Sequence, residues 1–478
     1  MHFDQRVFKA NDIRGTVPDQ LDDAFAFTLG KSLIAALGAN RVAIGRDCRT
    51  SSSTLHRALA TGLCAEGARV DSLGLCPSEL LYYAMGRNAD YELGVMVTAS
   101  HNPAAFNGFK VIGPGAVPIT QRNGLDEVRE LMLASTAPIP ADLDDPSEPI
   151  VIDKDYLRYT VQVAGGVKAN ALKIVVDPGN GMGGLLWKWL SRKADIETVR
   201  MNFDLDGTFP AHPPDPSKEE NLVPLRERVL SEGADLGFAY DGDADRTVVV
   251  LADGRIMNGG EMIAALVNVL LGTGRAARFA TCMMTARNVL EHFHALGLDP
   301  VIVPVGHAKV KRIMHADPSL AFGGEQSGHY YYREFSCCES SLMTTLLVLR
   351  MAADGSLARI AARLRRQWVA PPKEASFPFA RQERALEASR EAAMAGIDMF
   401  PGAQEIICEI DWEVARHCRA EDIQRSEAIR VDYADWWFCI RPSATEPLLR
   451  LWVEARDRAD REAKEAALSK VVSGFLEH

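Results

Sequence analysis

The chain has 478 residues, of which 47% are hydrophobic and 24% charged, a composition typical of globular proteins, and its length predicts three or four domains rather than one core. Lys and Arg number 53 and Asp and Glu number 64, so the formal net charge is −11. This acidic balance argues against a broad nucleic-acid binder, which needs a basic face, although converging Arg and Lys side chains can still attract a small anion.

The first part of the chain alternates helical patterns with short apolar runs, which predicts helices layered on a sheet. The expected elements are helices over 22–37 and 52–66 and strands over 42–44 and 93–97. Gly38 and Gly67 stand where each helix is expected to end. Residues 136–149 are rich in Pro, Asp and Ala and predict a linker.

The strand, glycine loop and helix plan recurs twice more, without a clean sequence repeat, and the last part of the chain departs from it. Further strands are expected at 173–176, 236–239, 247–251, 406–410 and 436–440. The chain ends with a helix rich in Ala, Glu, Lys and Arg. We expect four domains, over residues 1–148, 149–252, 253–369 and 370–478.

The nine cysteines form no CxxC pair and lie mostly in apolar surroundings, so reduced thiols are expected. No apolar segment typical of a signal peptide follows Met1. The most apolar stretch, 262–271, is about half as long as a membrane helix needs to be. We therefore expect a soluble, cytoplasmic protein with no membrane partner.

Three aspartates, Asp241, Asp243 and Asp245, follow the strand at 236–239. Alternate residues of an extended chain point to one side, so we expect the three carboxylates to converge. Like charges at such range repel one another, and a hard cation relieves the repulsion; all-oxygen ligands favour Mg²⁺ over Zn²⁺. Three carboxylates supply half an octahedron, so the cation needs outside oxygens such as those of a phosphate. The alternative is a polar turn.

Ser100 lies in the sequence TASHNP, at the end of the strand at 93–97. No Asp–His relay lies beside it to activate the hydroxyl, and a turn or helix cap is the alternative reading. A phosphorylated Ser100 would carry about −1.5 to −2 charge and need a cation. The phosphate on the serine loop would then supply the outside oxygens, and the aspartate loop would supply the bound cation. His101 and Lys110 are basic groups that could position or protonate, or be surface residues.

Two later loops suit a sugar and an anion. In the sequence GEQSGH, Glu325 and Ser327 can hydrogen-bond to a polyol and His329 can move protons near neutral pH, unless the segment is a plain β-turn. In RPSATEP, one guanidinium, two hydroxyls and free backbone N–H groups predict an anion site, with a proline-delimited turn as the alternative. The residues of this anion loop are Arg441, Ser443 and Thr445.

These motifs, in this order, resemble those of the α-D-phosphohexomutases, most closely the bacterial phosphomannomutase/phosphoglucomutase group. The resemblance spans the chain, from FKANDIRG at 8–15 through TASHNP, DGDADR and GEQSGH to RPSATEP at 441–447. It implies an α/β protein with four domains around a central cleft. Three are related α/β sandwich units, and the C-terminal one is a TATA-binding-protein-like α+β domain.

The resemblance also implies the roles of the site residues. Mg²⁺ would be held by the phosphate on Ser100 and by the three aspartates. Lys110 and His329 match positions for general base and acid work, and Arg246 lies beside the phosphate. The implied catalytic residues are Ser100, His101, Lys110, Arg246 and His329. The implied or candidate substrate contacts are Arg14, His307, Lys309, Glu325, Ser327, Arg441, Ser443 and Thr445.

The implied reaction interconverts hexose 6-phosphate and hexose 1-phosphate, of mannose and also of glucose. Phosphoserine 100 gives its phosphoryl group to the sugar, and a hexose 1,6-bisphosphate turns end for end before it returns the other phosphate. Hexose phosphates are the expected partners of a monomer or homodimer, and nucleotide-sugar supply is the usual setting of the family.

Three positions depart from the closest group: Asn11 replaces the usual Tyr, Met283 replaces Lys or Arg, and Gln326 replaces Met or Leu. Gln at that last position is typical of phosphoglucosamine mutases, which are the first alternative. A serine- and metal-dependent phosphatase is the second alternative. A non-catalytic sugar-phosphate binder, suggested by Asn11 and Met283, is the third.

Overall fold

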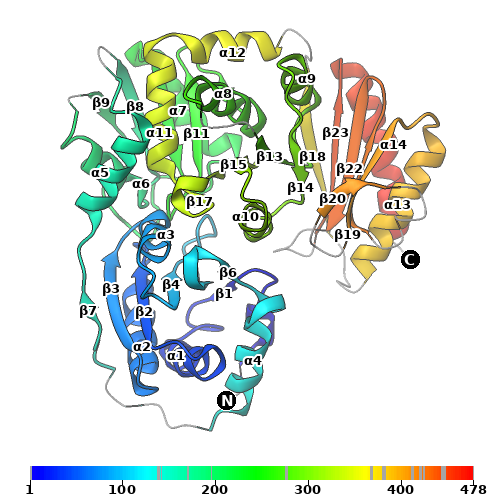
Figure 1. Cartoon of the computed structure of the whole chain (residues 1–478). Helices are drawn as coiled ribbons and strands as arrows, with labels where there is room; N and C mark the ends of the chain where they lie inside the picture. Colours follow the sequence, from blue (N-terminus) through cyan, green and yellow to red (C-terminus); the bar gives the residue numbers. More distant parts are fainter. Residues whose placement is uncertain are drawn as a thin grey trace. The chain divides into compact units, whose positions relative to one another are not determined.

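The structure is a computed structural model that describes residues 3–136, 140, 143–169, 172–194, 196–274, 278–365, 370–378, 384–410, 414–418, 423, 426–442 and 448–476. The chain forms two compact units. Unit 1 comprises residues 1–258 and 327–357, and unit 2 comprises residues 259–326 and 358–478. Figure 1 follows the chain by colour from the N-terminus to the C-terminus.

The first sheet of unit 1 and its helices are formed by residues 5–149. Its elements are η1 (Gln5–Val7), β1 (Ile13–Thr16), α1 (Asp23–Leu37), β2 (Arg41–Arg46), α2 (Ser52–Ala65), β3 (Arg69–Leu75), α3 (Ser78–Arg87), β4 (Leu93–Val97), β5 (Phe106–Ile112), η2 (Pro114–Ala116), β6 (Pro118–Ile119), η3 (Gln121–Asn123), α4 (Leu125–Ala134) and β7 (Glu148–Pro149). The strand order is β1-β5-β4-β2-β3-β7, with β6 beside β5. The helical crossovers make β2 parallel to β3 and β4, whereas β4 and β5 form an antiparallel hairpin.

The local sequence explains the ends of α1. The Asp22 carboxylate accepts the Phe25 N–H at 2.7 Å and caps the first turn. Gly38 ends the helix with a left-handed backbone, φ 68°, which glycine adopts without the steric cost of a side chain. The apolar faces of α1, α2 and the sheet form the core of this layer.

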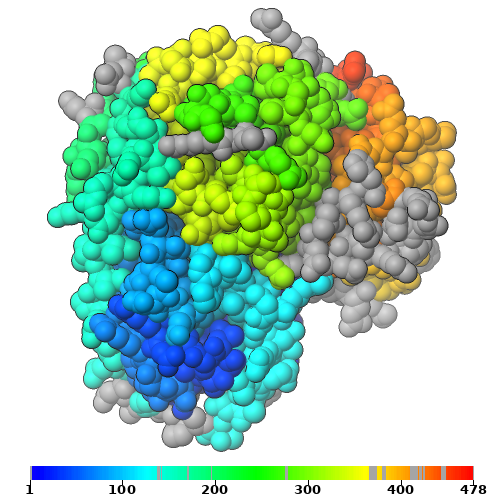
Figure 2. All heavy atoms as spheres, viewed as in Figure 1, coloured from blue at the N-terminus to red at the C-terminus, as the bar shows by residue number. Residues whose placement is uncertain are grey.

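The second sheet of unit 1 presents the aspartate loop. Its elements are α5 (Asp153–Ala164), β8 (Lys173–Asp177), α6 (Gly183–Leu190), β9 (Glu197–Arg200), α7 (Glu219–Glu232), β10 (Leu236–Tyr240), β11 (Thr247–Leu251) and β12 (Ile256–Met257). The strand order is β12-β11-β10-β8-β9, and β10 and β11 are antiparallel. The loop that joins them is the DGDADR sequence. In Figure 2 the teal surface of α5 continues from the surface of the first sheet and its helices.

Residues 327–357 return to unit 1 and join its two sheets. They form β16 (Tyr330–Tyr332), η4 (Arg333–Phe335), β17 (Cys338–Glu339) and α11 (Ser341–Ala353), and β16 and β17 pair antiparallel. Tyr156 on α5 hydrogen-bonds Ser340, and Tyr240 on β10 hydrogen-bonds Thr345, each at 2.7 Å. These buried contacts hold residues 327–357 against the second sheet, and the Leu342 N–H, which donates to Glu79 on α3, links them to the first.

Unit 2 contains a parallel layer and an antiparallel sheet, and α12 (Ser356–Arg365) connects the units in sequence. The parallel layer is formed by α8 (Gly259–Gly272), β13 (Arg278–Cys282), α9 (Arg287–Ala295), β14 (Val301–Val303), α10 (His307–Ala316) and β15 (Leu320–Gly324). The antiparallel sheet and its helices are formed by β18 (Ala370–Pro378), α13 (Ala385–Met399), β19 (Glu405–Ile410), β20 (Val414–His417), β21 (Ser426–Asp432), β22 (Trp436–Pro442), β23 (Leu448–Ala455) and α14 (Arg458–Leu476). Its strand order is β18-β23-β22-β21-β19-β20.

One sequence expectation is wrong: Cys408 and Cys418 form a disulfide rather than two reduced thiols. The antiparallel pairing of β19 and β20 places Cys408 opposite Arg416, so Cys418, two residues further on, is its diagonal neighbour, with the two Cα atoms 6.0 Å apart. Among the described residues, none of the helices is both long and apolar enough to span a bilayer. The cytoplasmic location and the monomeric or dimeric state stay predictions.

Candidate active site

Ser100 occupies a strained position on the loop between β4 and β5. Its backbone has φ 49°, in the left-handed region, which costs a non-glycine residue about 1–3 kcal/mol and is common at functional sites. The residue is 2% exposed. Its Oγ donates to Asp241 Oδ2 at 2.7 Å and lies 3.2 Å from His101 Nδ1. The serine loop and the aspartate loop therefore meet directly, as the sequence predicted.

Arg49 holds the serine loop, and the sequence reasoning missed it. Its buried guanidinium donates to the carbonyl oxygens of Ser100 and Asn102, at 2.8 and 2.7 Å. It also donates to the carbonyl oxygens of Pro103 and Phe106, at 2.8 and 3.0 Å. The sequence could have pointed to Arg49, because Asp47-Cys48-Arg49 directly follow β2. The carboxyl ends of adjacent parallel strands lie at one edge of a sheet, so this loop is expected near the serine loop after β4.

The three aspartates converge for a reason that differs from the predicted one. Residues 241–246 form a turn rather than an extended strand, and Ala244 has φ 59°. The turn is closed by the N–H groups of Asp245 and Arg246, which both donate to Asp241 Oδ1 at 3.0 Å. The convergence was predicted correctly, but the alternation of side chains in extended chain does not cause it.

Gly242 allows the two loops to approach each other. A Cβ at this position would lie 2.5 Å from the Ser100 carbonyl oxygen, far closer than van der Waals contact permits. The absence of a side chain therefore brings the backbone of the aspartate loop against the backbone of the serine loop.

The aspartate cluster suits a hard cation. One carboxylate oxygen of each of the three residues lies within 4.8 Å of the others, and all three side chains are buried. Burial, and then the charges of Asp245 and Asp243, raise the pKa of Asp241 well above its usual range. Asp243 Oδ1 is buried and accepts no hydrogen bond from any residue that the structure describes. Such a set of oxygens is the donor chemistry that Mg²⁺ prefers.

Lys110 reaches the same cluster from β5. Its Nζ lies 2.6 Å from both Asp243 Oδ2 and Asp245 Oδ2. Burial alone would lower the pKa of Lys110, but these two carboxylates raise it well above its usual value. These two contacts favour the charged ammonium form of Lys110, and its predicted work as a general base stays a prediction.

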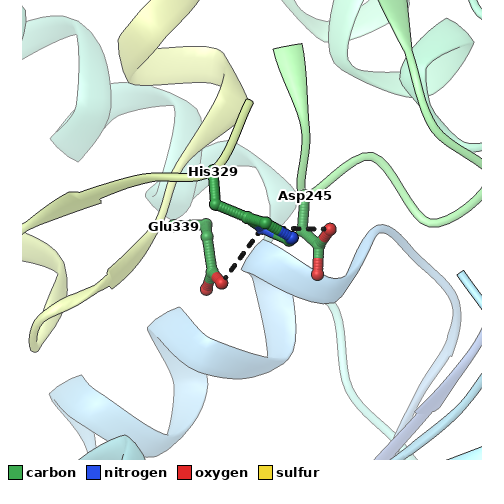
Figure 3. A group of neighbouring side chains, drawn as sticks. All are labelled: Asp245, His329 and Glu339. Carbon is green, nitrogen blue, oxygen red and sulfur yellow. Dashed lines mark ion pairs between the residues drawn. The ribbon is translucent and has the colours of Figure 1, made fainter. Parts of the chain in front are cut away.

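His329 lies beside the aspartates, and Figure 3 shows it together with Asp245 and Glu339. His329 precedes β16, and its Nε2 accepts the Arg246 Nε–H at 3.0 Å. Its Nδ1 lies 3.6 Å from Asp245 Oδ1 and 3.3 Å from Glu339 Oε1.

Burial, and then the positive charge of Arg246, lower the pKa of His101 well below its usual value, which favours the neutral form of the His101 imidazole. Ser100, His101, Lys110, Arg246 and His329 are all brought together in unit 1.

Arg14, on β1, supports the serine loop through hydrogen bonds. Its Nη1 donates to the Ala99 carbonyl at 2.8 Å and to Asn102 Oδ1 at 2.5 Å, and its Nε donates to Asp12. The side chain is 9% exposed, and these contacts hold the loop in place.

The remaining candidate substrate contacts divide between the units. Ser327 belongs to unit 1, whereas His307, Lys309, Glu325 and Arg441 belong to unit 2. Glu325 Oε1 accepts the Gly306 N–H at 2.7 Å, at the start of α10. Lys309 forms ion pairs with Glu409 and Glu427 of the antiparallel sheet. Ser443 and Thr445 lie outside the described residues.

Two positions that depart from the family pattern are engaged in packing within unit 2. The Gln326 side-chain oxygen accepts the Gly260 N–H at 2.9 Å, at the first turn of α8. Met283 is fully buried in a cluster with Trp437 and Cys439 of the antiparallel sheet. Beside this cluster, Arg430 donates to the Met283 and Thr285 carbonyls at 2.7 Å.

Comparison with known proteins follows the same order of domains. Four family models match: phosphoglucomutase/phosphomannomutase α/β/α domain I at residues 5–137, domain II at 154–254, domain III at 258–367 and the C-terminal domain at 382–469. The chain belongs to the phosphoglucomutase/phosphomannomutase family. This membership confirms the predicted fold class, the enzyme class of phosphohexomutase, and the reaction type, the interconversion of hexose phosphates.

Relatives of this family resemble the chain over nearly its whole length. The phosphohexose mutases of Xanthomonas campestris are 33% identical over 98% of this chain and 99% of theirs. The phosphomannomutase/phosphoglucomutase of Pseudomonas putida is 31% identical over 95% of this chain and 92% of its own. The crystal structure of a phosphoglucomutase/phosphomannomutase family protein from Burkholderia thailandensis has a TM-score of 0.81 at 26% identity, covering 99% and 98% of the two chains.

Proposed function

We propose that this phosphohexomutase interconverts the 6-phosphate and 1-phosphate of mannose, and also of glucose, through a phosphoserine at residue 100 and a hexose 1,6-bisphosphate. The observation that carries the proposal is the Ser100 hydroxyl, held at φ 49° and 2.7 Å from Asp241 in a buried three-carboxylate cluster. The hydroxyl makes its shorter contact, at 2.7 Å, with Asp241, and a longer one, at 3.2 Å, with the His101 imidazole. The hydroxyl is placed beside ligands for a cation, as a phosphate carrier requires.

The residues of unit 1 have complementary roles in the proposed transfer. A Mg²⁺ ion held by Asp241, Asp243 and Asp245 would supply positive charge to the phosphoryl oxygens. Arg246 presents a guanidinium beside His329, and such a group stabilises the charge of a transferring phosphoryl. As the bond from Ser100 Oγ to phosphorus breaks, the sugar oxygen bonds to phosphorus and releases its proton to His329.

The ammonium of Lys110 completes the proton balance, because it can give a proton to the departing Ser100 Oγ. The roles reverse when the second phosphate returns to Ser100. Burial of the site limits the loss of the phosphoryl group to water.

We assign the sugar and its distal phosphate to the remaining predicted contacts. Glu325 and Ser327 are proposed to bind sugar hydroxyls, and Arg14, His307 and Lys309 to contribute to anion binding. Arg441, Ser443 and Thr445 are proposed to bind the distal phosphate. These contacts would come from four domains with the boundaries predicted above, which is the arrangement the family models support.

The alternative of a phosphoglucosamine mutase rested on Gln326. In the structure this side chain accepts the Gly260 N–H at the start of α8, so its amide oxygen is already used within unit 2. The names of the relatives from Xanthomonas and Pseudomonas also support the broader hexose class. Mannose and glucose phosphates therefore remain the favoured substrates.

Intact-mass analysis and a coupled assay test the proposal together. The purified protein should carry one phosphate, and with Mg²⁺ and a trace of glucose 1,6-bisphosphate it should convert mannose 1-phosphate and glucose 1-phosphate. Ser100→Ala should carry no phosphate and lose nearly all turnover while it still binds the sugar phosphate. Release of free phosphate without isomerisation would indicate the phosphatase, binding without turnover would indicate the non-catalytic binder, and turnover of glucosamine 6-phosphate alone would indicate the phosphoglucosamine mutase.

A further inference from the structure

Glu339 lies against His329, although no motif of the sequence pointed to it. The hairpin of β16 and β17 places Tyr331 opposite Glu339, and His329 stands just before β16. Glu339 is 1% exposed, and its Oε1 lies 3.3 Å from His329 Nδ1. Figure 3 shows the carboxylate pointing at the ring from the neighbouring strand.

The contacts on the two ring nitrogens define the tautomer of His329. The Arg246 Nε–H can only donate, and it lies 3.0 Å from His329 Nε2. Nε2 must therefore carry the lone pair, and in a neutral ring the proton is on Nδ1. The carboxylates of Glu339 and Asp245 lie 3.3 and 3.6 Å from that Nδ1, close enough for their negative charge to attract the Nδ1 proton. Both sides of the ring thus favour the same tautomer.

The same three side chains could instead hold a metal ion. Ligand atoms of Asp245, His329 and Glu339 lie within 4.8 Å of one another. A metal on Nδ1 would need the lone pair there and would move the proton to Nε2. Two N–H donors would then face each other across 3.0 Å, at Arg246 and His329. The hydrogen bond from Arg246 to Nε2 therefore fits an imidazole with its proton on Nδ1 rather than a metal centre.

Glu339 and Asp245 differ in their other contacts. Asp245 also binds the Lys110 ammonium at 2.6 Å and belongs to the three-carboxylate cluster, so it is shared with the cation chemistry. Glu339 approaches His329 more closely than Asp245 does, at 3.3 Å against 3.6 Å, and stands outside that cluster.

We propose that Glu339 is a positioning residue that orients His329 with its proton on Nδ1, so that Nε2 keeps the lone pair that takes up the proton of the sugar hydroxyl once Arg246 turns to the transferring phosphoryl group. This inference rests on the proposed function for its catalytic meaning. The orientation of the ring can be tested without turnover.

The experiment compares the full-length protein with Glu339→Ala, Glu339→Gln and the control Glu79→Gln. Glu79 is equally buried and accepts the Leu342 N–H just beyond β17, but it is not part of the site. The coupled assay gives kcat and KM for mannose 1-phosphate. Nitrogen-15 labelling of the 11 histidines, with His329→Gln to assign the signal, reports by NMR which ring nitrogen of His329 carries the proton.

Glu339→Ala should lower kcat about 10- to 100-fold with KM within about twofold, and should shift His329 toward the Nε2–H form. Glu339→Gln should lose less, because its amide oxygen still accepts the Nδ1–H. Glu79→Gln should keep the kcat of the unchanged protein. An unchanged kcat in Glu339→Ala, or an equal loss in Glu79→Gln, would overturn the proposal.

The spectrum of the unchanged protein is a test that does not depend on whether a variant folds. His329 protonated on Nδ1 supports the proposal, and His329 protonated on Nε2, which a metal on Nδ1 would require, refutes it. A protein that turns over no hexose phosphate but shows the Nδ1–H form would disprove the proposed function while leaving the arrangement of Glu339 and His329 intact.

Discussion

Substitution of Gly242 by Ala tests how closely the serine and aspartate loops must approach. The added Cβ would lie 2.5 Å from the Ser100 carbonyl oxygen, about 0.9 Å short of the 3.4 Å at which ordinary contact begins. The Ser100 carbonyl cannot easily retreat, because Arg49 Nη2 already binds it at 2.8 Å. The loops must therefore separate by most of that distance, or the Arg49 bond must lengthen.

Two effects of different size follow from this separation. Overpacking of a tight contact costs about 1–3 kcal/mol of stability. A misplacement near 1 Å between reacting groups can cost about 100-fold in rate. Because Ser100 and Asp241 stand on opposite sides of the clash, we expect kcat/KM to fall about 10- to 100-fold while the protein stays folded.

The coupled mutase assay and thermal denaturation measure the two effects separately. Gly272→Ala is the matched control, since its Cβ meets nothing within 4 Å at the end of α8 and alanine favours a helix. A Gly242→Ala enzyme that keeps kcat/KM within about twofold of the unchanged protein would refute the idea that transfer depends on this close approach.

Three further predictions follow from the same contacts. Asp243→Asn should raise the Mg²⁺ concentration needed for half-maximal activity by about tenfold or more, measured by titration of the metal; an unchanged requirement would count against the three-aspartate site. Arg49→Ala should lower the free energy of unfolding by about 3–5 kcal/mol, because it leaves Asp47 buried without its guanidinium partner, whereas Arg57→Ala on the exposed side of α2 should change little in denaturant titrations. Burial raises the pKa of Glu79 from 4.5 to about 8, so the folded state holds a proton that the unfolded chain has lost in this range. The stabilisation of the folded state by Glu79 is complete below about pH 4.5 and is lost as the pH rises to about 8. Across this window the unfolding constant rises by up to about tenfold per pH unit. The Tm of Glu79→Gln should therefore rise relative to that of the unchanged protein across this window, and parallel Tm profiles would contradict the assignment.

The sequence predicted the elements that a local pattern controls. The helix of α1 is bounded by Asp22 and Gly38, and the strands β4, β10 and β11 are apolar runs that end at polar loops. The motifs also predicted which loops would meet, because their chemistry is complementary: Ser100 contacts Asp241, and Lys110 contacts Asp243 and Asp245.

The rest depends on contacts between segments far apart in the chain. Arg49 donates hydrogen bonds to the carbonyl groups of residues about fifty positions later, and no local sequence pattern predicts such a bond. Glu339 comes close to His329 because the hairpin of β16 and β17 pairs the two strands. The turn at Ala244 needs a positive φ that alanine rarely adopts, so an extended loop was the natural expectation.

The buried cluster around Met283 limits how the protein can be divided. Cys282, Met283 and Met284 share a core with Ile407, Ala428, Trp437 and Cys439, and the guanidinium of Arg430 is enclosed in the same region. A fragment cut near residue 369 would leave each half with an apolar face exposed to water. Recombination of C-terminal domains among family members must therefore exchange both sides of this cluster together, because a boundary in the sequence is not a boundary in the hydrophobic core.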